Sequence, residues 1–299
     1  MVRHGNSYYS VESRENAIWV YRTDTLTKLK RNGTRVWSPP QLGWNRQDIW
    51  APELHRIGDR WYIYYTAGQA GNGFQDQRSG VLESLSDDAQ GGYADRGMLH
   101  TGDDVATGLD PKWAIDLTVR EINGQRYAVW SGWEQNTTND RTPQHLYIAR
   151  MSSPTTIATN RVRISSPTAS WEDGTELDLQ EGPTFLVNGD RTFIVYSTRE
   201  SWLPAYKLGM LTLASPTADP LNPASWTKSA APVFTGNDAQ GVYGAGHASF
   251  TTSPDGTEQW IVYHSKTLNS PGWDDRVIRM QKFTWNADGT PNFGTPVPN

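Results

Sequence analysis

The sequence predicts an all-β protein that folds as a five-bladed β-propeller. Helical periodicity is hard to find, and short aromatic or β-branched runs alternate with turns rich in Gly, Asn and Asp. One hairpin pattern also recurs five times along the chain. Small sheets that repeat around an axis produce such a pattern, because each blade is one supersecondary unit of similar length.

The recurring pattern is a turn containing glycine, followed by a strand rich in aromatic and β-branched residues. Its copies are RHGNSYYSVES, HRIGDRWYIYYTAG, REINGQRYAVWSGW, FLVNGDRTFIVYST and SPDGTEQWIVYHS. Such tight turns need the positive φ that Gly and Asn tolerate. The turn glycines are spaced by 53, 66, 65 and 67 residues: Gly5, Gly58, Gly124, Gly189 and Gly256.

A further strand follows each hairpin and completes a blade of three or four strands. These strands read AIWVYRT, RSGVLES, QHLYIARM, YKLGMLTL and RVIRMQKFTW. One long β-sandwich with coincidental turn spacing is the alternative, and five consecutive matches weigh against it. We therefore expect residues 1–299 to form one catalytic propeller domain.

Composition excludes several classes of protein. The net charge of −5 is spread without like-charged runs, which argues against a nucleic-acid partner. No apolar run approaches the roughly 20 residues of a membrane span, so no membrane partner is expected. Cysteine is absent, which excludes disulfides and thiolate chemistry. The 14 tryptophans are the unusual feature, because an indole suits stacking on sugars or bases as well as core filling. The oligomeric state is not indicated.

Titratable residues fall at similar depths on the predicted innermost strands. Asp116 and Glu181 lie eight positions before their turn glycines, and His247 lies nine before its own. The same count in the second blade reaches Trp50. Charged residues are rarely buried without a purpose, so the group is a candidate site, although each residue alone could be a solvated strand end.

Two carboxylates facing a sugar-sized cavity, with tryptophan nearby, suit glycoside hydrolysis, in which one acid is protonated and another is charged. Trp50 is expected to stack on sugar, with simple packing as its alternative. Four further tryptophans lie in loops or at strand ends, where some are expected to wall the mouth of the site: Trp113, Trp133, Trp171 and Trp202.

At these residues the sequence resembles glycoside hydrolase family 43. The matching phrases include IWAPELHRIGDRWYIYYTAG, WAIDLTVREINGQRYAVWSGW, LQEGPTFLVNGDRTFIVYS, GVYGAGHASFTTSPDGTEQWIVYH and DDRVIRMQKFTWNADGTPNFG. They run from about residue 44 to the end. The resemblance implies the five-bladed propeller of a family of inverting arabinosidases, xylosidases and arabinanases. Within that family, the matching motifs are most similar to those of exo-acting α-L-arabinofuranosidases.

The resemblance also implies roles for single residues. Glu181 resembles the general acid, and Asp116 the carboxylate that raises the pKa of that acid and orients it. His247 resembles a channel histidine near a bound ion, often calcium held through water; structural filling of the channel is an equal alternative, because calcium prefers oxygen ligands. Arg276 resembles an arginine that contacts sugar hydroxyls, with a surface strand arginine as the alternative. No cofactor is required.

The family's general base is expected on the first strand of blade one, eight residues before Gly5, and that position precedes Met1. We read Met1–Gly5 as the end of that strand, apparently truncated. Asp48 or Glu53 could be proposed as a substitute, but Glu53 is expected to be a structural partner within blade two. Loss of a positioned base costs about 10²–10⁴-fold in rate.

We expect this chain to fold and bind sugar but to hydrolyse it poorly. Ordinary arabinofuranosidase turnover by the purified 299-residue chain without an N-terminal extension would contradict this expectation. So would another carboxylate lying about 6.5–9.5 Å from Glu181 across the sugar site.

The expected function is removal of terminal arabinose from arabinan or arabinoxylan, with inversion. A β-xylosidase, an endo-arabinanase and a catalytically impaired carbohydrate-binding propeller are the alternatives. A protein-interaction propeller would not need acidic residues in register. The expected partners are arabinose- or xylose-containing saccharides, and because such polymers lie outside cells we expect an extracellular protein, although MVRHGNSYYS is not a signal peptide.

Overall fold

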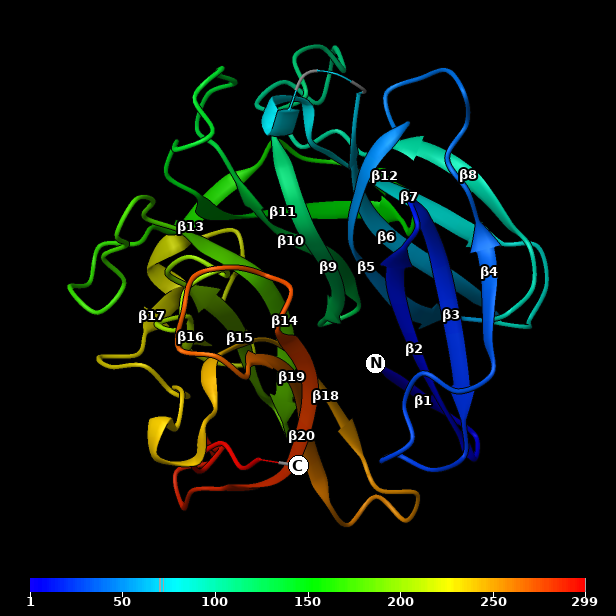
Figure 1. Cartoon of the computed structure of the whole chain (residues 1–299). Helices are drawn as coiled ribbons and strands as arrows, with labels where there is room; N and C mark the ends of the chain where they lie inside the picture. Colours follow the sequence, from blue (N-terminus) through cyan, green and yellow to red (C-terminus); the bar gives the residue numbers. More distant parts are fainter. Residues whose placement is uncertain (70, 72, 299) are drawn as a thin grey trace. The chain divides into compact units, whose positions relative to one another are not determined.

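The computed structural model describes residues 1–69, 71 and 73–298, which form five small sheets. Each sheet takes consecutive strands from the chain, so neighbouring strands are joined by hairpins and run antiparallel (Figure 1). The chain divides into two compact units: Met1–Asp140 with Tyr147–Val162, and Arg141–Leu146 with Arg163–Asn299. No helix among the described residues is long and apolar enough to cross a membrane.

The first unit holds two whole sheets and most of a third. The first sheet has four strands: β1 (Val2–His4), β2 (Ser7–Arg14), β3 (Ala17–Thr23) and β4 (Gly33–Trp37). The second sheet also has four: β5 (Gln47–Ile57), β6 (Arg60–Gly68), β7 (Arg78–Ser84) and β8 (Tyr93–Met98), with the 3₁₀ turn η1 (Gly73–Asp76) between β6 and β7. The third has five: β9 (Ala114–Ile122), β10 (Gln125–Gly132), β11 (His145–Ser153), β12 (Thr156–Ile157) and β13 (Val162–Ser165).

The second unit holds two sheets of four strands each. The first contains β14 (Gln180–Asn188), β15 (Arg191–Thr198), β16 (Lys207–Leu213) and β17 (Trp226–Lys228), with η2 (Pro223–Ser225) before β17. The last contains β18 (Tyr243–Thr252), β19 (Gln259–Lys266), β20 (Arg276–Trp285) and β21 (Pro291–Asn292), with η3 (Asp238–Gln240) before β18.

The hairpins form where the glycine pattern places them. All five turn glycines have φ between 58° and 75°, the left-handed conformation that a tight turn needs. The predicted strands AIWVYRT, RSGVLES and RVIRMQKFTW coincide with β3, β7 and β20. The pattern of turn and strand was therefore predicted correctly from the sequence.

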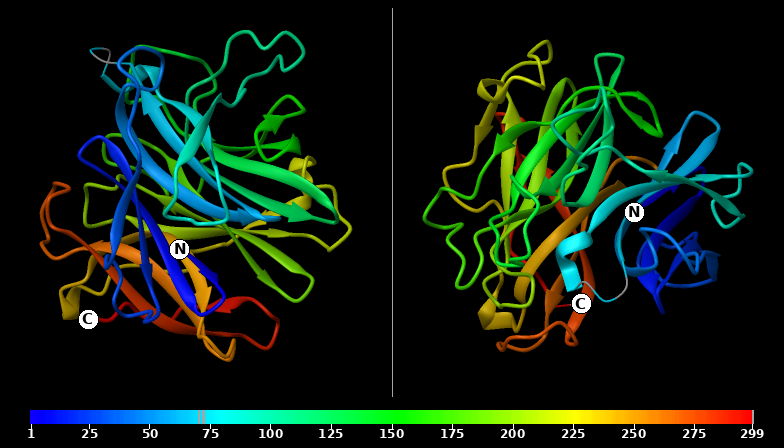
Figure 2. Two further views of the ribbon diagram at one scale, coloured as in Figure 1. Left: turned by 90° about the vertical axis from the view of Figure 1, so that its right-hand side faces the viewer. Right: turned by 90° about the horizontal axis from the view of Figure 1, so that it is seen from above.

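Successive side chains of a strand point to opposite faces of the sheet, so apolar residues at neighbouring positions bury both faces. In β6, Tyr62 and Tyr64 pack into a core shared with β9, β10 and β11. Trp61, Ile63 and Tyr65 point to the other face and join a core shared with β2 and β3. Figure 2 shows the first and second sheets side by side within this unit. The period of two thus predicts which neighbour each side chain contacts.

A layer of tyrosine, glycine and tryptophan recurs in both units. Gly80 of β7 pairs with Tyr65, and Trp44 stacks on that tyrosine with ring centroids 5.9 Å apart. Gly209 of β16 pairs in the same way with Tyr196. A Cβ added at Gly209 would lie 2.5 Å from Cζ of Tyr196 and 2.7 Å from the ring of Trp171. Glycine is therefore required sterically between the two rings.

We predict that Gly209→Ala lowers the free energy of unfolding by about 1–3 kcal/mol, because the methyl group overpacks a closed core. Gly92→Ala is the control: its nearest neighbour would be the flexible Cδ1 of Leu85, at 3.3 Å. We expect a change within about 0.5 kcal/mol for the control. Urea unfolding of both variants measures the difference, and equal midpoints would contradict the steric argument.

Candidate active site

The innermost strands of four sheets each contain a β-bulge. Pairing shifts in β5, β9, β14 and β18, and each strand carries a residue with positive φ at the shift. These residues are Ala51 (40°), Asp116 (57°), Gly182 (52°) and His247 (49°). For a residue with a side chain this backbone costs about 1–3 kcal/mol, and such strain gathers at functional sites. The bulges therefore mark candidate positions.

Pairing on the second strand shows which residues are equivalent. Trp50 pairs with Thr66, and Glu181 pairs with Ser197. Glu181 therefore occupies the position of Trp50, one residue before the bulge. Asp116 and His247 occupy the bulge position itself. Counting back from the turns placed the three titratable residues only approximately, because the number of residues between bulge and turn differs among sheets.

Buried hydroxyl groups hold the bulges. The amide of Asp116 donates to Oγ1 of Thr66 at 3.2 Å, and the amide of His247 donates to Oγ of Ser197 at 2.8 Å. Thr66 and Ser197 are fully buried. Each hydroxyl lies on the second strand of the preceding sheet of the same unit, so it satisfies an amide that the bulge removes from the strand pairing.

In the first unit, Asp116 and Trp50 lie beside an aromatic cluster. Trp113 and Trp133 stack with centroids 4.3 Å apart and planes at 2°. Both are buried, and Trp50 packs against their cluster. Trp50 also meets Phe74 edge to face, with centroids 4.8 Å apart. Some of four tryptophans were expected to wall the mouth of the site; of these four, Trp113 and Trp133 are buried and fill a core.

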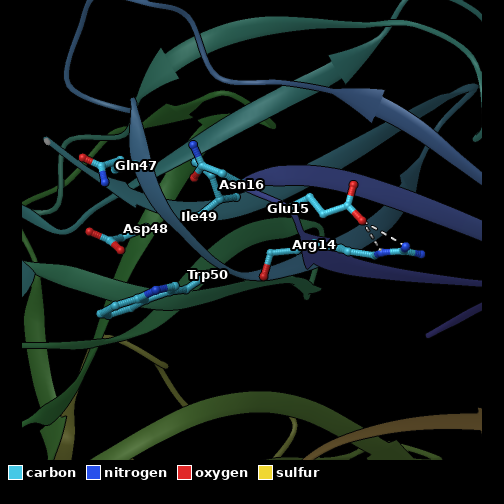
Figure 3. A pocket seen from close by; sticks show the side chains of 8 residues that line it. Arg14, Glu15, Asn16, Gln47, Asp48, Ile49 and Trp50 are labelled. Carbon is cyan, nitrogen blue, oxygen red and sulfur yellow. Dashed lines mark hydrogen bonds and ion pairs between the residues drawn. The ribbon is translucent and has the colours of Figure 1, made fainter. Parts of the chain in front are cut away.

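A shallow hollow of about 390 Å³ opens next to Trp50. Figure 3 shows Asp48 and Trp50 of β5 on one side of it and the Arg14–Glu15 pair on the other. Partial burial raises the pKa of Asp48 above its usual value. The indole of Trp50 lies among amide and carboxylate side chains. A site of this composition suits a sugar ring, which can stack on the indole and form hydrogen bonds with the polar groups.

Glu53 is engaged in a structural network. It accepts a hydrogen bond from Thr118 Oγ1 at 2.8 Å and pairs with His55 Nε2 at 2.9 Å. Burial favours the neutral form of Glu53, but His55 and Thr118 outweigh it and lower the pKa of this carboxyl. The predicted structural role of Glu53 agrees with these contacts.

In the second unit, Glu181 and His247 lie in one cluster with two residues that the sequence analysis did not single out. Tyr206 donates its hydroxyl proton to Oε1 of Glu181 at 2.8 Å. The Tyr206 ring stacks on His264 with centroids 5.4 Å apart and planes at 5°. His264 in turn lies 6.2 Å from the ring of His247.

The bulge glycine joins Glu181 to His247. A Cβ added at Gly182 would lie 3.0 Å from Nδ1 of His247, so the imidazole rests against the glycine backbone. Arg276 is exposed at the start of β20, and its charge acts on His264. The structure thus brings Glu181 and His247 together, and it places Arg276 on β20 two residues before the partner of His264.

A comparison of the hairpins could have found His264. In the second strands, YYTAG, VWSGW and VYSTR carry a hydroxyl residue where WIVYHS carries His264. Tyr206 had no such signal, because it lies just after a loop, before β16.

No group of three or more His, Asp or Glu side chains among residues 1–69, 71 and 73–298 is placed to hold a metal ion. The ring neighbour of His247 is an imidazole. This nitrogen donor does not fit direct coordination of calcium, which prefers oxygen. An ion held through water near His247 stays a prediction.

Comparisons with known proteins identify the class to which this fold and these strands belong. The model of the family Glycosyl hydrolases family 43 matches residues 1–291. The chain belongs to this family, so the predicted family and the predicted five-bladed β-propeller are both confirmed.

Among curated relatives, an extracellular exo-α-(1→5)-L-arabinofuranosidase of Streptomyces avermitilis is 37% identical, over 99% of this chain and 60% of that protein. An α-L-arabinofuranosidase B of Pyricularia oryzae is 34% identical, over 100% of this chain and 61% of that protein. The chain thus spans about 60% of the length of these relatives.

A solved structure is also similar. The crystal structure of an α-L-arabinofuranosidase from Lactobacillus brevis is 32% identical, with a TM-score of 0.86 over 98% of this chain and 91% of that chain. An endo-arabinase from Bacteroides thetaiotaomicron, at 17% identity and a TM-score of 0.70, shares the fold.

The cluster in the second unit predicts a pH dependence of stability. Burial lowers the pKa of His264 well below its usual value, and the charges of Arg276, His247 and Lys266 lower it further. The ordinary histidine pKa is about 6.5. As the pH falls below that value, the unfolded chain binds a proton that the folded chain does not, so the folded state loses stability.

We predict that His264→Gln removes this part of the pH dependence. The unfolding free energy of the unaltered chain should fall more steeply from pH 7 to pH 5 than that of the variant. Urea unfolding at pH 5, 6 and 7 measures both. His4→Gln, at an exposed histidine of β1, should parallel the unaltered chain. An unchanged slope in His264→Gln would show that this imidazole does not stay neutral.

Proposed function

We propose that this chain is an exo-acting α-L-arabinofuranosidase that removes terminal α-L-arabinofuranosyl residues from arabinan or arabinoxylan with inversion. The family membership supports glycosidase chemistry. The names of the relatives from Streptomyces avermitilis, Pyricularia oryzae and Lactobacillus brevis support arabinofuranosidase as the activity. Extracellular action is part of the proposal, since the Streptomyces relative is described as extracellular.

The observation that carries the proposal is the hydrogen bond from Tyr206 to Glu181. A general acid must hold its proton in line with the leaving oxygen, and the phenol fixes one oxygen of Glu181 while the bulge turns the strand. In this proposal Glu181 donates a proton to the glycosidic oxygen as the bond to the anomeric carbon breaks. Tyr206 is a positioning residue.

Asp116 is proposed as the carboxylate that raises the pKa of the acid and orients it. A second negative charge near a carboxyl disfavours its ionisation, which keeps it protonated until it reacts. The strained backbone of Asp116, and the hydrogen bond that its backbone N–H donates to the hydroxyl of Thr66, support a fixed orientation for this residue.

The remaining predicted residues are proposed to bind the sugar. Trp50 offers a partly buried indole beside a polar hollow, and Arg276 offers an exposed guanidinium. His247 lies against Gly182 and supports the position of Glu181. Inversion also needs a base that activates water, and no residue is proposed for that role.

We predict that Glu181→Gln lowers kcat/KM on arabino-oligosaccharides by about 10²–10⁴-fold, because their leaving group needs a proton. On 2,4-dinitrophenyl α-L-arabinofuranoside the loss in kcat/KM should be much smaller, because dinitrophenolate leaves without being protonated. Product release by chromatography and dinitrophenol absorbance measure the two rates.

Glu121→Gln is the matched control, because Glu121 is exposed and pairs only at 3.5 Å with Arg126. Its activity should not change. Equal losses on both substrates in Glu181→Gln would contradict the role of general acid. Faster hydrolysis of an aryl xyloside than of the aryl arabinofuranoside would favour β-xylosidase, and internal cleavage of arabinan would favour endo-arabinanase.

A further inference from the structure

Two tryptophans from different sheets form an open aromatic corner in the second unit. Trp202 lies in the loop between β15 and β16, and Trp273 lies in the loop between β19 and β20. Their ring centroids are 5.4 Å apart with planes at 65°. All 14 tryptophans lie within the described residues, and Trp273 alone is exposed, at 48%. A single exposed apolar side chain is ordinary on a protein surface, so the way in which the two rings are held decides whether they form a site.

Direct bonds fix the two loops to each other. The amide of Gly272 donates to the carbonyl oxygen of Trp202 at 2.8 Å. The indole Nε1 of Trp273 donates to Oγ of Ser201 at 3.2 Å. The corner between the two rings is therefore held by both backbone and side chain.

A buried cation holds the second loop from below. Lys266 is fully buried, and its ammonium group donates to the carbonyl of Gly272 and to the carboxylate of Asp275. Asp275 also accepts from the amides of Thr267 and Leu268, at 3.0 and 2.7 Å. Burying an ammonium is costly unless it is paired, so this arrangement favours one loop conformation. In that conformation Trp273 is exposed to solvent. Because the loop is already ordered, it loses little conformational entropy when a ligand binds.

Planar polar groups flank the aromatic corner. The guanidinium of Arg141 lies 5.6 Å over the ring of Trp202 and pairs with Glu176 at 2.9 Å. An indole matches the C–H face of a sugar ring, while guanidinium and carboxylate groups match its hydroxyls. This combination favours a carbohydrate over an apolar ligand.

Each loop ends next to a residue that the proposed function uses. Tyr206, whose hydroxyl binds Glu181, lies four positions after Trp202, so the Cα atoms of Trp202 and Tyr206 are at most about 14 Å apart. Asp275 is followed immediately by Arg276. The corner is therefore within reach of the next sugars of a chain whose end is bound at Glu181.

We propose that Trp202 and Trp273 form a second carbohydrate-binding position, where Trp273 stacks on a pentose ring of the arabinan or arabinoxylan chain. This rests on the proposed function, because it places that ring next to the sugar cleaved at Glu181. The position makes longer substrates bind better than a single arabinose unit does.

The test compares Trp273→Ala with the unaltered chain on two substrates. For α-1,5-linked arabinopentaose, kcat/KM should fall at least tenfold, mainly through KM. For 4-nitrophenyl α-L-arabinofuranoside, which has one sugar, it should change less than twofold. Trp273→Phe should restore most of the loss. Trp260→Ala is the control, since Trp260 is partly buried under Lys282 at 5.6 Å and should leave both values unchanged.

Calorimetry with arabinopentaose separates this inference from the proposed function. Trp273→Ala should weaken binding at least tenfold even in a Glu181→Gln background, in which hydrolysis is slow. Binding that depends on Trp273 without any hydrolysis would support the second position and overturn the arabinofuranosidase proposal. Hydrolysis with an unchanged arabinopentaose affinity in Trp273→Ala would overturn the second position alone. Absence of both would overturn both.

Discussion

The candidate site depends on a bend in the innermost strands. At each bulge the chain enters a left-handed conformation. At two of the bulges, a buried hydroxyl group of the preceding sheet accepts a hydrogen bond from the backbone N–H of Asp116 or of His247. The bend changes the side of the strand to which the following side chains point, so it decides which residues face inward. Gly182 is the clearest case, because the ring of His247 occupies the space that a Cβ would need.

Buried charges, in addition to apolar contacts, hold the loops of the second unit. Glu200 is fully buried and accepts the amides of Thr175, Glu176 and Leu177. Lys266 holds the loop on the other sheet in the opposite sense, because its ammonium group donates to the carbonyl of Gly272 and to the carboxylate of Asp275. A charged acceptor that binds several backbone amides stabilises a loop without covering it, so the loop's surface stays accessible.

The sequence was sufficient for the hairpins because their signal is local. A glycine with positive φ and a strand of alternating residues occupy adjacent positions, so the pattern is complete within about a dozen residues. Glu181 and His247 could be paired in advance because both lie on such strands. Asp116 was singled out by the same count, although the bulge lies at slightly different distances from the turn in each sheet.

Other features depend on contacts between distant segments, which a local pattern does not record. Trp113 and Trp133 each lie next to the end of a strand, yet they stack on each other in the core. Tyr206 gave no signal, because its link to Glu181 spans 25 positions and belongs to no repeat.

The single exposed indole has an optical consequence. An indole in water emits at longer wavelength than a buried one, so we expect Trp273, the most exposed tryptophan, to contribute to the red edge of the protein's fluorescence. With no cysteine in the chain, no native thiol would compete with a dye placed on an engineered one. The molecule thus carries its own spectroscopic reporter at the rim of the loop between β19 and β20.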